Sequence, residues 1–201
     1  MYYRRSPFNC RLMLKQPYNQ GINTQQIPPK KLLMHTSTHE GATGFTLAYT
    51  FQAPQEQVFG AFGNAEALNA WWGPAETQNS VICLDFRPGG IFHFRMVSAG
   101  GVHYGRFLFT RIEPHYLLEF NNAFADEDAN VVPPPFDLPF PLEVHYKLVF
   151  SEYNGATTIT LTGTPVDADP EATAGFHAIR DSMEQGFGGT FGKLAHYLQQ
   201  Q

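Results

Sequence analysis

Few cysteines, few charged residues and no long apolar segment characterise this sequence, and each shortage excludes a class of protein. Two of the 201 residues are cysteine, too few for a disulfide-rich secreted framework or a four-cysteine zinc site. No apolar run approaches the roughly 20 residues that a membrane-spanning helix needs. No signal-peptide pattern opens the chain, so we expect a cytoplasmic protein without a membrane span.

Positive charge is also scarce, and it is unevenly placed. The chain holds 13 Lys and Arg against 18 Asp and Glu, which gives a formal net charge of −5. Residues 1–40 carry six of the basic residues and one acid, whereas residues 41–201 carry seven basic residues and 17 acids. Because an acidic body repels a phosphate backbone, we expect no nucleic-acid partner.

Motifs of the common catalytic classes are missing. The Gly-x-Ser-x-Gly motif of serine hydrolases does not occur. The glycine-rich stretch 186–193 does not fit a phosphate-binding Walker loop, which would need glycine at Phe187 and Ser or Thr at Leu194. No histidine pairs with another ligand at a recognised metal spacing, and His93 and His145 fall on the polar phase of expected strands, as surface histidines do. We expect no metal, no cofactor and no intrinsic ATPase activity.

The first 43 residues differ in composition from the rest of the chain. They are rich in Gln and Asn, contain four prolines and lack apolar periodicity, which indicates a disordered leader that is not necessarily part of the mature protein. A nearly acid-free, Arg-rich composition also fits an organellar transit peptide, and a start codon assigned too far upstream of Met34 explains it equally well. We expect one folded domain over residues 44–201.

The periodicity of the apolar residues predicts an α+β domain. Apolar side chains alternate from Phe45 onward, as in a half-buried strand, and turn signals separate further segments of this kind. Two short helices, the first opened by Pro54 and the second ending at Trp71 and Trp72, interrupt the first two strands. Apolar residues recur every three or four positions over 170–198, which predicts one long amphipathic helix. The expected strands are 45–51, 76–86, 91–97, 102–112, 116–122, 141–151 and 156–164.

Two segments depart from this regular pattern. Gly186, Gly188, Gly189 and Gly192 are each unfavourable by about 1 kcal/mol inside a helix, so either close packing or room for a ligand must compensate. Residues 123–140 form an unusually long inter-strand loop with an acidic run and four prolines. Such a loop is either a solvated excursion or a lid.

The apolar phases of the strands predict a concave face rich in Phe, Tyr and Met. One helix cannot fill so aromatic a concavity, which favours a residual pocket over a fully packed interior, although both remain open. The fourth expected strand is ambiguous, because Phe107 and Phe109 compete with Tyr104 for the inner face. If Tyr104 faces inward, Arg106 does too and requires a partner.

Four short motifs follow the first strand in a fixed order: Trp71-Trp72-Gly73-Pro74, Asp85-Phe86-Arg87-Pro88-Gly89-Gly90, Ile112-Glu113-Pro114, and Gly186-Phe187 with Lys193-Leu194-Ala195. With them, the chain from residue 44 to 199 resembles the activator of Hsp90 ATPase homologue family of the START-like, or SRPBCC, superfamily. The resemblance implies the helix-grip (Bet v 1-like) fold, a curved seven-stranded antiparallel sheet around a long C-terminal helix, with a deep hydrophobic cavity between them.

The chain departs from the family pattern at two places. Phe187 stands where the family often has Trp, and the 123–140 loop is longer than usual. Chaperone-activating members also carry an additional N-terminal domain that a 43-residue leader does not replace. These departures weaken the expectation of a chaperone partner and bear on the shape of a pocket.

The residues and the resemblance together predict a module that binds a small hydrophobic molecule between the sheet and the last helix. The alternatives are an Hsp90-directed co-chaperone and a cyclase-like enzyme, for which no catalytic residue stands out, and the oligomeric state is left open. A structural plug is the competing interpretation of the paired tryptophans. The predicted ligand-binding residues are Trp71, Trp72, Phe92, Phe94, Met96, Tyr104, Arg106, Tyr146, Ile179, Met183 and Phe187.

Overall fold

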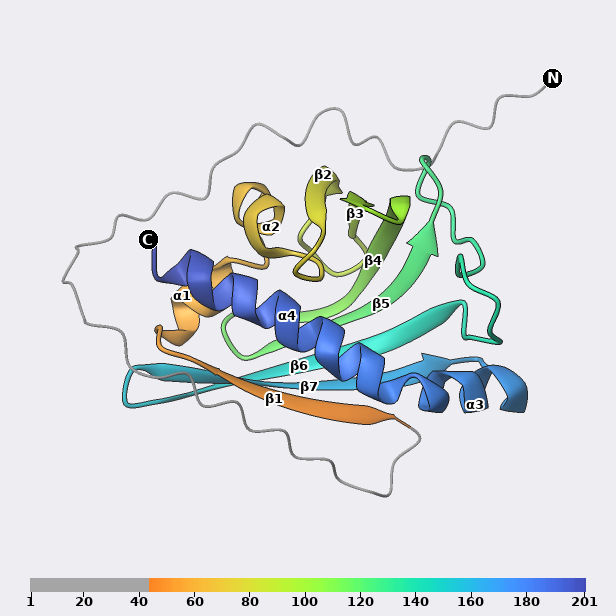
Figure 1. Ribbon diagram of the computed structural model, residues 1–201. Coiled ribbons are helices and arrows are strands. Elements are labelled where there is room, and N and C mark those ends of the chain that lie inside the picture. Colours follow the sequence, from red (N-terminus) through yellow and green to blue (C-terminus); the bar gives the residue numbers. More distant parts are fainter. Residues whose placement is uncertain (1–43) are drawn as a thin grey trace.

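A computed structural model describes residues 44–201, and the predicted leader 1–43 lies outside the described residues. Seven antiparallel strands form one sheet in the order β1-β7-β6-β5-β4-β3-β2, and α4 crosses one face of it (Figure 1). The predicted α+β class and the seven strands are confirmed. The elements are β1 (Phe45–Phe51), α1 (Gln55–Gly60), α2 (Ala65–Trp71), β2 (Gln78–Leu84), β3 (Ile91–Ser98), β4 (Gly101–Glu113), β5 (Leu117–Ala125), β6 (Glu143–Tyr153), β7 (Ala156–Val166), α3 (Pro170–Ala178) and α4 (Arg180–Leu198).

Local sequence sets the ends of the two short helices. The Asn64 side chain accepts hydrogen bonds from the backbone N–H groups of Glu66 and Ala67, which caps the start of α2. The helix ends where Trp72 adopts an extended backbone and Gly73 a φ of +99°, a region that glycine enters without strain. The Trp72-Gly73 step therefore turns the chain from α2 toward β2.

The predicted long C-terminal helix is interrupted at Ile179, which separates α3 from α4 with φ −104° and ψ 17°. The two halves pack against different parts of the chain. A Cβ on Gly175 in α3 would lie 1.8 Å from the carbonyl oxygen of Pro139, and Phe176 contacts Phe140 with ring centroids 5.9 Å apart. Because α3 packs against the 136–140 segment and α4 packs against the sheet, the helix axis changes direction at Ile179.

The long inter-strand loop packs onto the domain at both ends. Val131 forms an isolated antiparallel bridge with Ala125, and Phe136 contacts Phe140, which leads on to α3. Both ends of the loop are thus held against the domain, whereas most of residues 133–139 between them are exposed. Within residues 44–201, no helix is long and apolar enough to cross a membrane.

Aromatic side chains dominate the core between the concave face of the sheet and α4. The rings of Phe107 and Phe120 stack with centroids 3.9 Å apart, and the Phe120 ring contacts the Tyr146 ring with centroids 5.7 Å apart. Tyr146 in turn contacts Phe187 of α4 at 5.1 Å. Burying a side chain of this size contributes about 1.5–3 kcal/mol, so this face carries most of the hydrophobic stabilisation.

Candidate functional site

The concave face brings together eight of the eleven predicted ligand-binding residues. They belong to one hydrophobic cluster or pack against it, and they come from the end of α2 and the residue after it, β3, β6 and α4. Ile179 lies instead at the junction of α3 and α4. The eight are Trp71, Trp72, Phe92, Phe94, Met96, Tyr146, Met183 and Phe187.

Tyr104 and Arg106 lie on the opposite, convex face of the sheet, which corrects their placement in the pocket. Phe107 and Phe109 take the inner face of β4, so the residues of the alternate phase point outward. Arg106 donates a hydrogen bond to the carbonyl oxygen of Ala129 at 3.1 Å and pairs with Glu143 at 3.3 Å. Its guanidinium group thus finds partners on the convex face, although its Nε has none within residues 44–201.

His93 is buried, contrary to the expectation of a surface histidine. It is 3% exposed, because residues 126–132 cover this part of the convex face. Its ring Nε2–H donates to the backbone carbonyl of Asp126 at 3.0 Å. Burial lowers the pKa of the His93 ring, with a smaller opposing effect from Asp126.

The two adjacent tryptophans differ in their hydrogen bonding. Trp71 Nε1 donates to the carbonyl oxygen of Ala61 at 3.1 Å, so its buried N–H is satisfied. Trp72 is 7% exposed and packs on Phe107 with centroids 4.9 Å apart, yet its Nε1 has no hydrogen-bond partner among the described residues. An unsatisfied buried donor costs about 1–3 kcal/mol. The N–H of Trp71 is therefore used within the fold, whereas Trp72 leaves a polar atom inside the aromatic cluster.

Of the four other buried polar atoms without partners within residues 44–201, Arg106 Nε lies on the convex face and Glu184 Oε1 belongs to α4, and the remaining two lie on the inner side of the sheet. The Tyr49 hydroxyl is one; this residue is 2% exposed, contacts Phe191 of α4, and has a phenol pKa raised by burial. The other is Oδ1 of Asn79, a residue 8% exposed whose Nδ2 donates to the carbonyl oxygen of Leu68 at 3.0 Å. Sequence analysis missed both, although an asparagine in the buried phase of a strand was an available signal.

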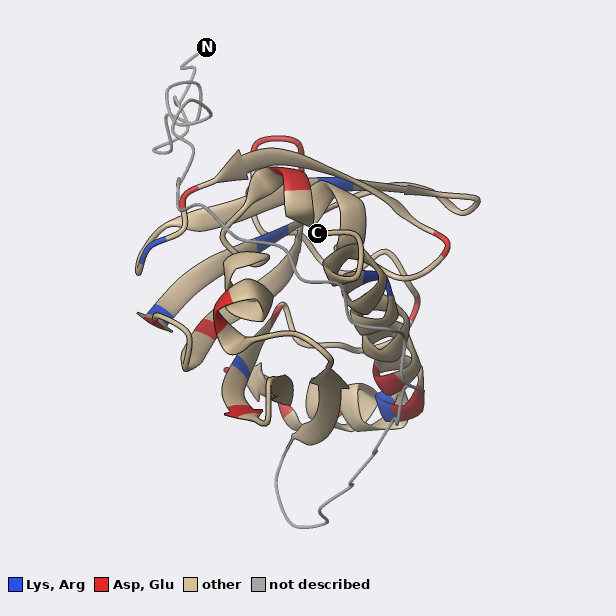
Figure 2. Cartoon of the chain, turned by 90° about the vertical axis from the view of Figure 1, so that its left-hand side faces the viewer, with Lys and Arg blue, Asp and Glu red and all other residues tan. Residues whose placement is uncertain are grey.

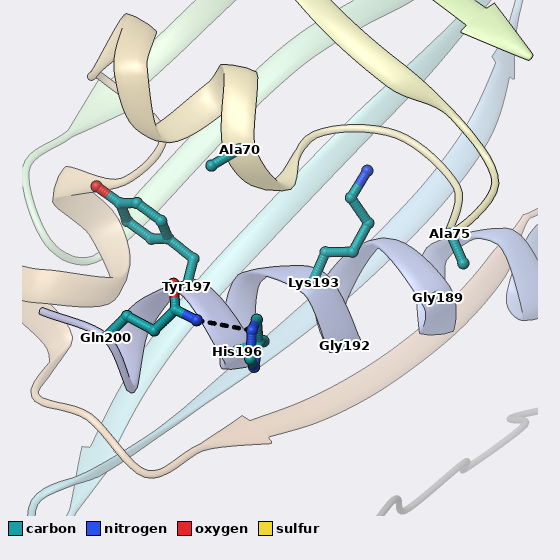
Figure 3. A pocket seen from close by; sticks show the side chains of 8 residues that line it. All are labelled: Ala70, Ala75, Gly189, Gly192, Lys193, His196, Tyr197 and Gln200. Atoms are coloured by element: carbon teal, nitrogen blue, oxygen red, sulfur yellow. Dashed lines mark hydrogen bonds between the residues drawn. The ribbon is translucent and has the colours of Figure 1, made fainter.

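A groove of about 390 Å³ lies outside this cluster, between α4, α2 and the turn after Trp72 (Figure 3). Lys193 crosses it and donates to the carbonyl oxygens of Gly73, Pro74 and Thr77 at 3.2–3.4 Å. Burial lowers the pKa of its ammonium group. The lining residues are Ala70, Ala75, Gly189, Gly192, Lys193, His196, Tyr197 and Gln200.

Close packing does not account for two of the helical glycines. A Cβ on Gly186 or Gly192 would meet no atom within 4 Å, and one on Gly189 would only touch Ala75 at 3.6 Å. Of the two explanations for these residues, tight packing is therefore excluded at Gly186 and Gly192.

Comparison with solved structures identifies the fold. A solution NMR structure of a protein from Arthrobacter aurescens is 23% identical, with a TM-score of 0.67 over 82% of this chain and 92% of that chain. A crystal structure from Mycobacterium smegmatis is 24% identical, with a TM-score of 0.59 over 86% and 95%. The AHSA1 protein from Silicibacter pomeroyi is 22% identical, with a TM-score of 0.57 over 77% and 96%. These similarities establish the helix-grip fold.

Sequence comparison gives the family. No curated protein matches the sequence significantly. A family model described as Activator of Hsp90 ATPase homolog 1-like protein matches residues 52–199, which covers the domain from the end of β1 to the end of α4. The chain therefore belongs to the activator of Hsp90 ATPase homologue 1-like family.

Proposed function

We propose that this protein binds a small, mainly apolar molecule between the concave face of the sheet and α4. The observation that carries the proposal is the set of polar atoms on Tyr49, Trp72 and Asn79 that are buried without partners in the part of the chain described. Native proteins satisfy the large majority of buried polar groups. A bound molecule that reaches these atoms explains their retention in an otherwise aromatic interior.

The α4 side of the cluster offers the means to admit such a molecule. Met183 and Phe187 close the interior from the helix, and both are only partly buried. Methionine adapts its shape readily, and the glycines of α4 lower the helix propensity of the same segment. Rotation of these two side chains makes room without unpacking the sheet. The proposed lining is Trp72, Phe92, Phe94, Met96, Tyr146, Met183 and Phe187.

Substitution of Met183 tests this proposal with naphthalene as an apolar probe. Met183→Trp adds volume at the helix side of the site and should lower naphthalene affinity by about fivefold or more, since overpacking a site costs at least about 1 kcal/mol. Isothermal titration calorimetry measures the affinity. Met183→Leu, which conserves volume, is the matched control and should bind nearly as the parent chain does. Equal affinity in both variants, or no binding of naphthalene to the parent chain, contradicts the proposal.

A chaperone partner is the second candidate, and the match to the family model over residues 52–199 is what favours it. An ATPase assay with purified Hsp90 decides it. Stimulation of ATP hydrolysis by the full chain at micromolar concentration supports a co-chaperone, and an unchanged rate excludes one.

A further inference from the structure

We infer that the ligand of this site is an uncharged molecule carrying a hydroxyl group, an alcohol or a phenol, which Trp72 and Asn79 recognise. This inference rests on the proposed function and specifies its ligand. Trp72 Nε1 can only donate a hydrogen bond, and Asn79 Oδ1 can only accept one. Both are buried without a partner in residues 44–201. A hydroxyl group both accepts and donates, so a ligand hydroxyl is able to satisfy either atom.

The two residues are anchored at the same point of the fold. The carbonyl oxygen of Leu68 accepts both the backbone N–H of Trp72 and Nδ2 of Asn79, each at 3.0 Å. The amide group of Asn79 is thereby held with Nδ2 occupied and Oδ1 left over. Trp72 is fixed by its ring contacts, at 4.9 Å to Phe107 and 5.9 Å to Phe94. A donor and an acceptor are thus positioned before any ligand binds, which lowers the entropic cost of recognition.

Charge on the ligand is disfavoured at this site. Among residues 44–201, no Asp, Glu, Lys or Arg belongs to the buried set. In α4 the charged residues are Arg180, Asp181 and Glu184 at the start and Lys193 near the end (Figure 2). Oε1 of Glu184 is buried without a partner in residues 44–201, so this side chain adds negative charge and no cation. Lys193 directs its ammonium group to three carbonyl oxygens of the 73–77 turn. An anion brought into the cluster would lose its hydration without gaining a counter-ion.

The Tyr49 hydroxyl adds a third polar contact on the β1 side of the cluster. Its ring lies against Phe51 and Phe191, at 4.8 and 5.6 Å, so the hydroxyl belongs to the part of the interior that α4 covers. A phenol hydroxyl donates or accepts. It therefore tolerates a second carbonyl or hydroxyl on the ligand without selecting between them, whereas the Trp72 and Asn79 pair selects for a hydroxyl.

Three probes of similar size separate the apolar and polar parts of recognition. Naphthalene, 2-naphthol and 2-naphthoate are titrated calorimetrically into the full chain at neutral pH. We expect 2-naphthol to bind about tenfold more tightly than naphthalene, the effect of satisfying a buried polar group, and 2-naphthoate to bind more weakly than naphthalene. Equal affinities for naphthol and naphthalene, or tighter binding of naphthoate, overturn the inference. If naphthalene itself does not bind, the proposed function fails, and this is distinguishable from the loss of the hydroxyl preference alone.

Substitutions at Trp72 and Asn79 test whether these two residues cause the preference for a hydroxyl group. Trp72→Phe and Asn79→Leu remove the donor and the acceptor but keep apolar bulk, and each should reduce the ratio of naphthol to naphthalene affinity toward one. Thr157→Val is the control: it loses the hydrogen bond to Ala53, lowers the thermal stability, and should leave the ratio unchanged because Thr157 is not part of the proposed lining. A preference that survives in both test variants contradicts the assignment to these atoms. Because the three-probe comparison uses the unaltered chain, poor folding of a variant does not remove the test.

Discussion

Buried hydroxyl groups in this domain occur in two states, and the difference gives each a different energetic role. Thr157 is fully buried and donates to the carbonyl oxygen of Ala53 at 2.7 Å, so its hydroxyl stabilises the junction of β7 with the end of β1. Tyr49 is buried to a similar degree, yet its hydroxyl has no partner among the described residues. In the first case the polar atom supports the fold, and in the second it opposes the fold and is available to a ligand.

Tyr49→Phe should therefore stabilise the ligand-free protein. The substitution keeps the ring that contacts Phe51 and Phe191 and removes an unsatisfied hydroxyl. We expect the free energy of unfolding to rise by about 1 kcal/mol in urea denaturation. Thr157→Val is the control and should lower it by about 1–2 kcal/mol, because it leaves the Ala53 carbonyl unpaired. A destabilised Tyr49→Phe variant would show that the hydroxyl already has a partner.

At the scale of elements, α4 combines a well-packed face with glycines that its own packing does not require. Phe191 and Leu194 are fully buried against the sheet, whereas a side chain at Gly192 would extend into open space. In α3 the reverse holds, because Gly175 lies directly on the backbone of Pro139. Packing therefore does not require glycine at position 192 of α4, whereas it does require glycine at position 175 of α3.

Alanine substitutions at these two glycines should change stability in opposite directions. Gly192→Ala should raise the free energy of unfolding by about 1 kcal/mol, because alanine is the better helix former and its Cβ meets no atom. Gly175→Ala should lower it by about 2 kcal/mol or more, since α3 must move off the Pro139 carbonyl. Thermal unfolding followed by circular dichroism measures both. Equal effects of the two substitutions would contradict this account of the helices.

The positions of helices and strands were predictable where residues in the adjacent turns determine them. Which residues of β4 face the concave side was not predictable. Asn154 and Gly155 adopt φ of 51° and 76°, the conformation that an Asn-Gly hairpin turn favours, so the β6–β7 hairpin was readable. In β4 both phases are partly apolar, because the convex face also holds a small cluster in which Ala129 of the covering segment 126–132 lies with Cys83, Ile91 and Leu108 of the sheet. Alternation alone does not distinguish two covered faces.

The site was predictable in its apolar part only. Aromatic residues in the inner phase of β3 and at the end of α2 pointed to the cluster, and Trp72 was among them. Whether a buried polar atom finds a partner depends on groups distant in sequence: Trp71 is satisfied by Ala61, ten residues away, and Trp72 is not satisfied at all within the described residues. The polar recognition group could not be derived from sequence spacing.

At the scale of the whole molecule, the sheet has two covered faces that differ in size and chemistry. The concave face is aromatic and lies under α4, whereas residues 126–132 cover the convex face at His93. Arg106 stands opposite His93 in the β3–β4 register, and Asp126 and Asp128 face it from the covering segment. Residues 126–132 are called the convex cover here, and titration of the His93 ring links the stability of this cover to pH.

Mild acid should weaken the protein through His93. Burial lowers the pKa of this ring in the folded chain, whereas the unfolded chain binds the proton near the ordinary value of 6.5. The stability contributed by the neutral ring is thus fully present above pH 6.5 and is lost as the pH falls from that value through the folded-state pKa.

Urea denaturation between pH 7.5 and pH 5 measures this effect, with His93→Gln as the test variant because glutamine keeps a donor for Asp126 but does not titrate. The variant should show a shallower loss of unfolding free energy over this range than the parent chain. His145→Gln serves as the control, since His145 lies half-buried beside Asn121 and outside the cover, and it should retain the parent slope. If the unfolding free energy of the His93→Gln variant depends on pH as steeply as that of the parent chain, the acid-sensitive group lies elsewhere. A shallower dependence would assign the acid sensitivity of the domain to the convex cover rather than to the aromatic site.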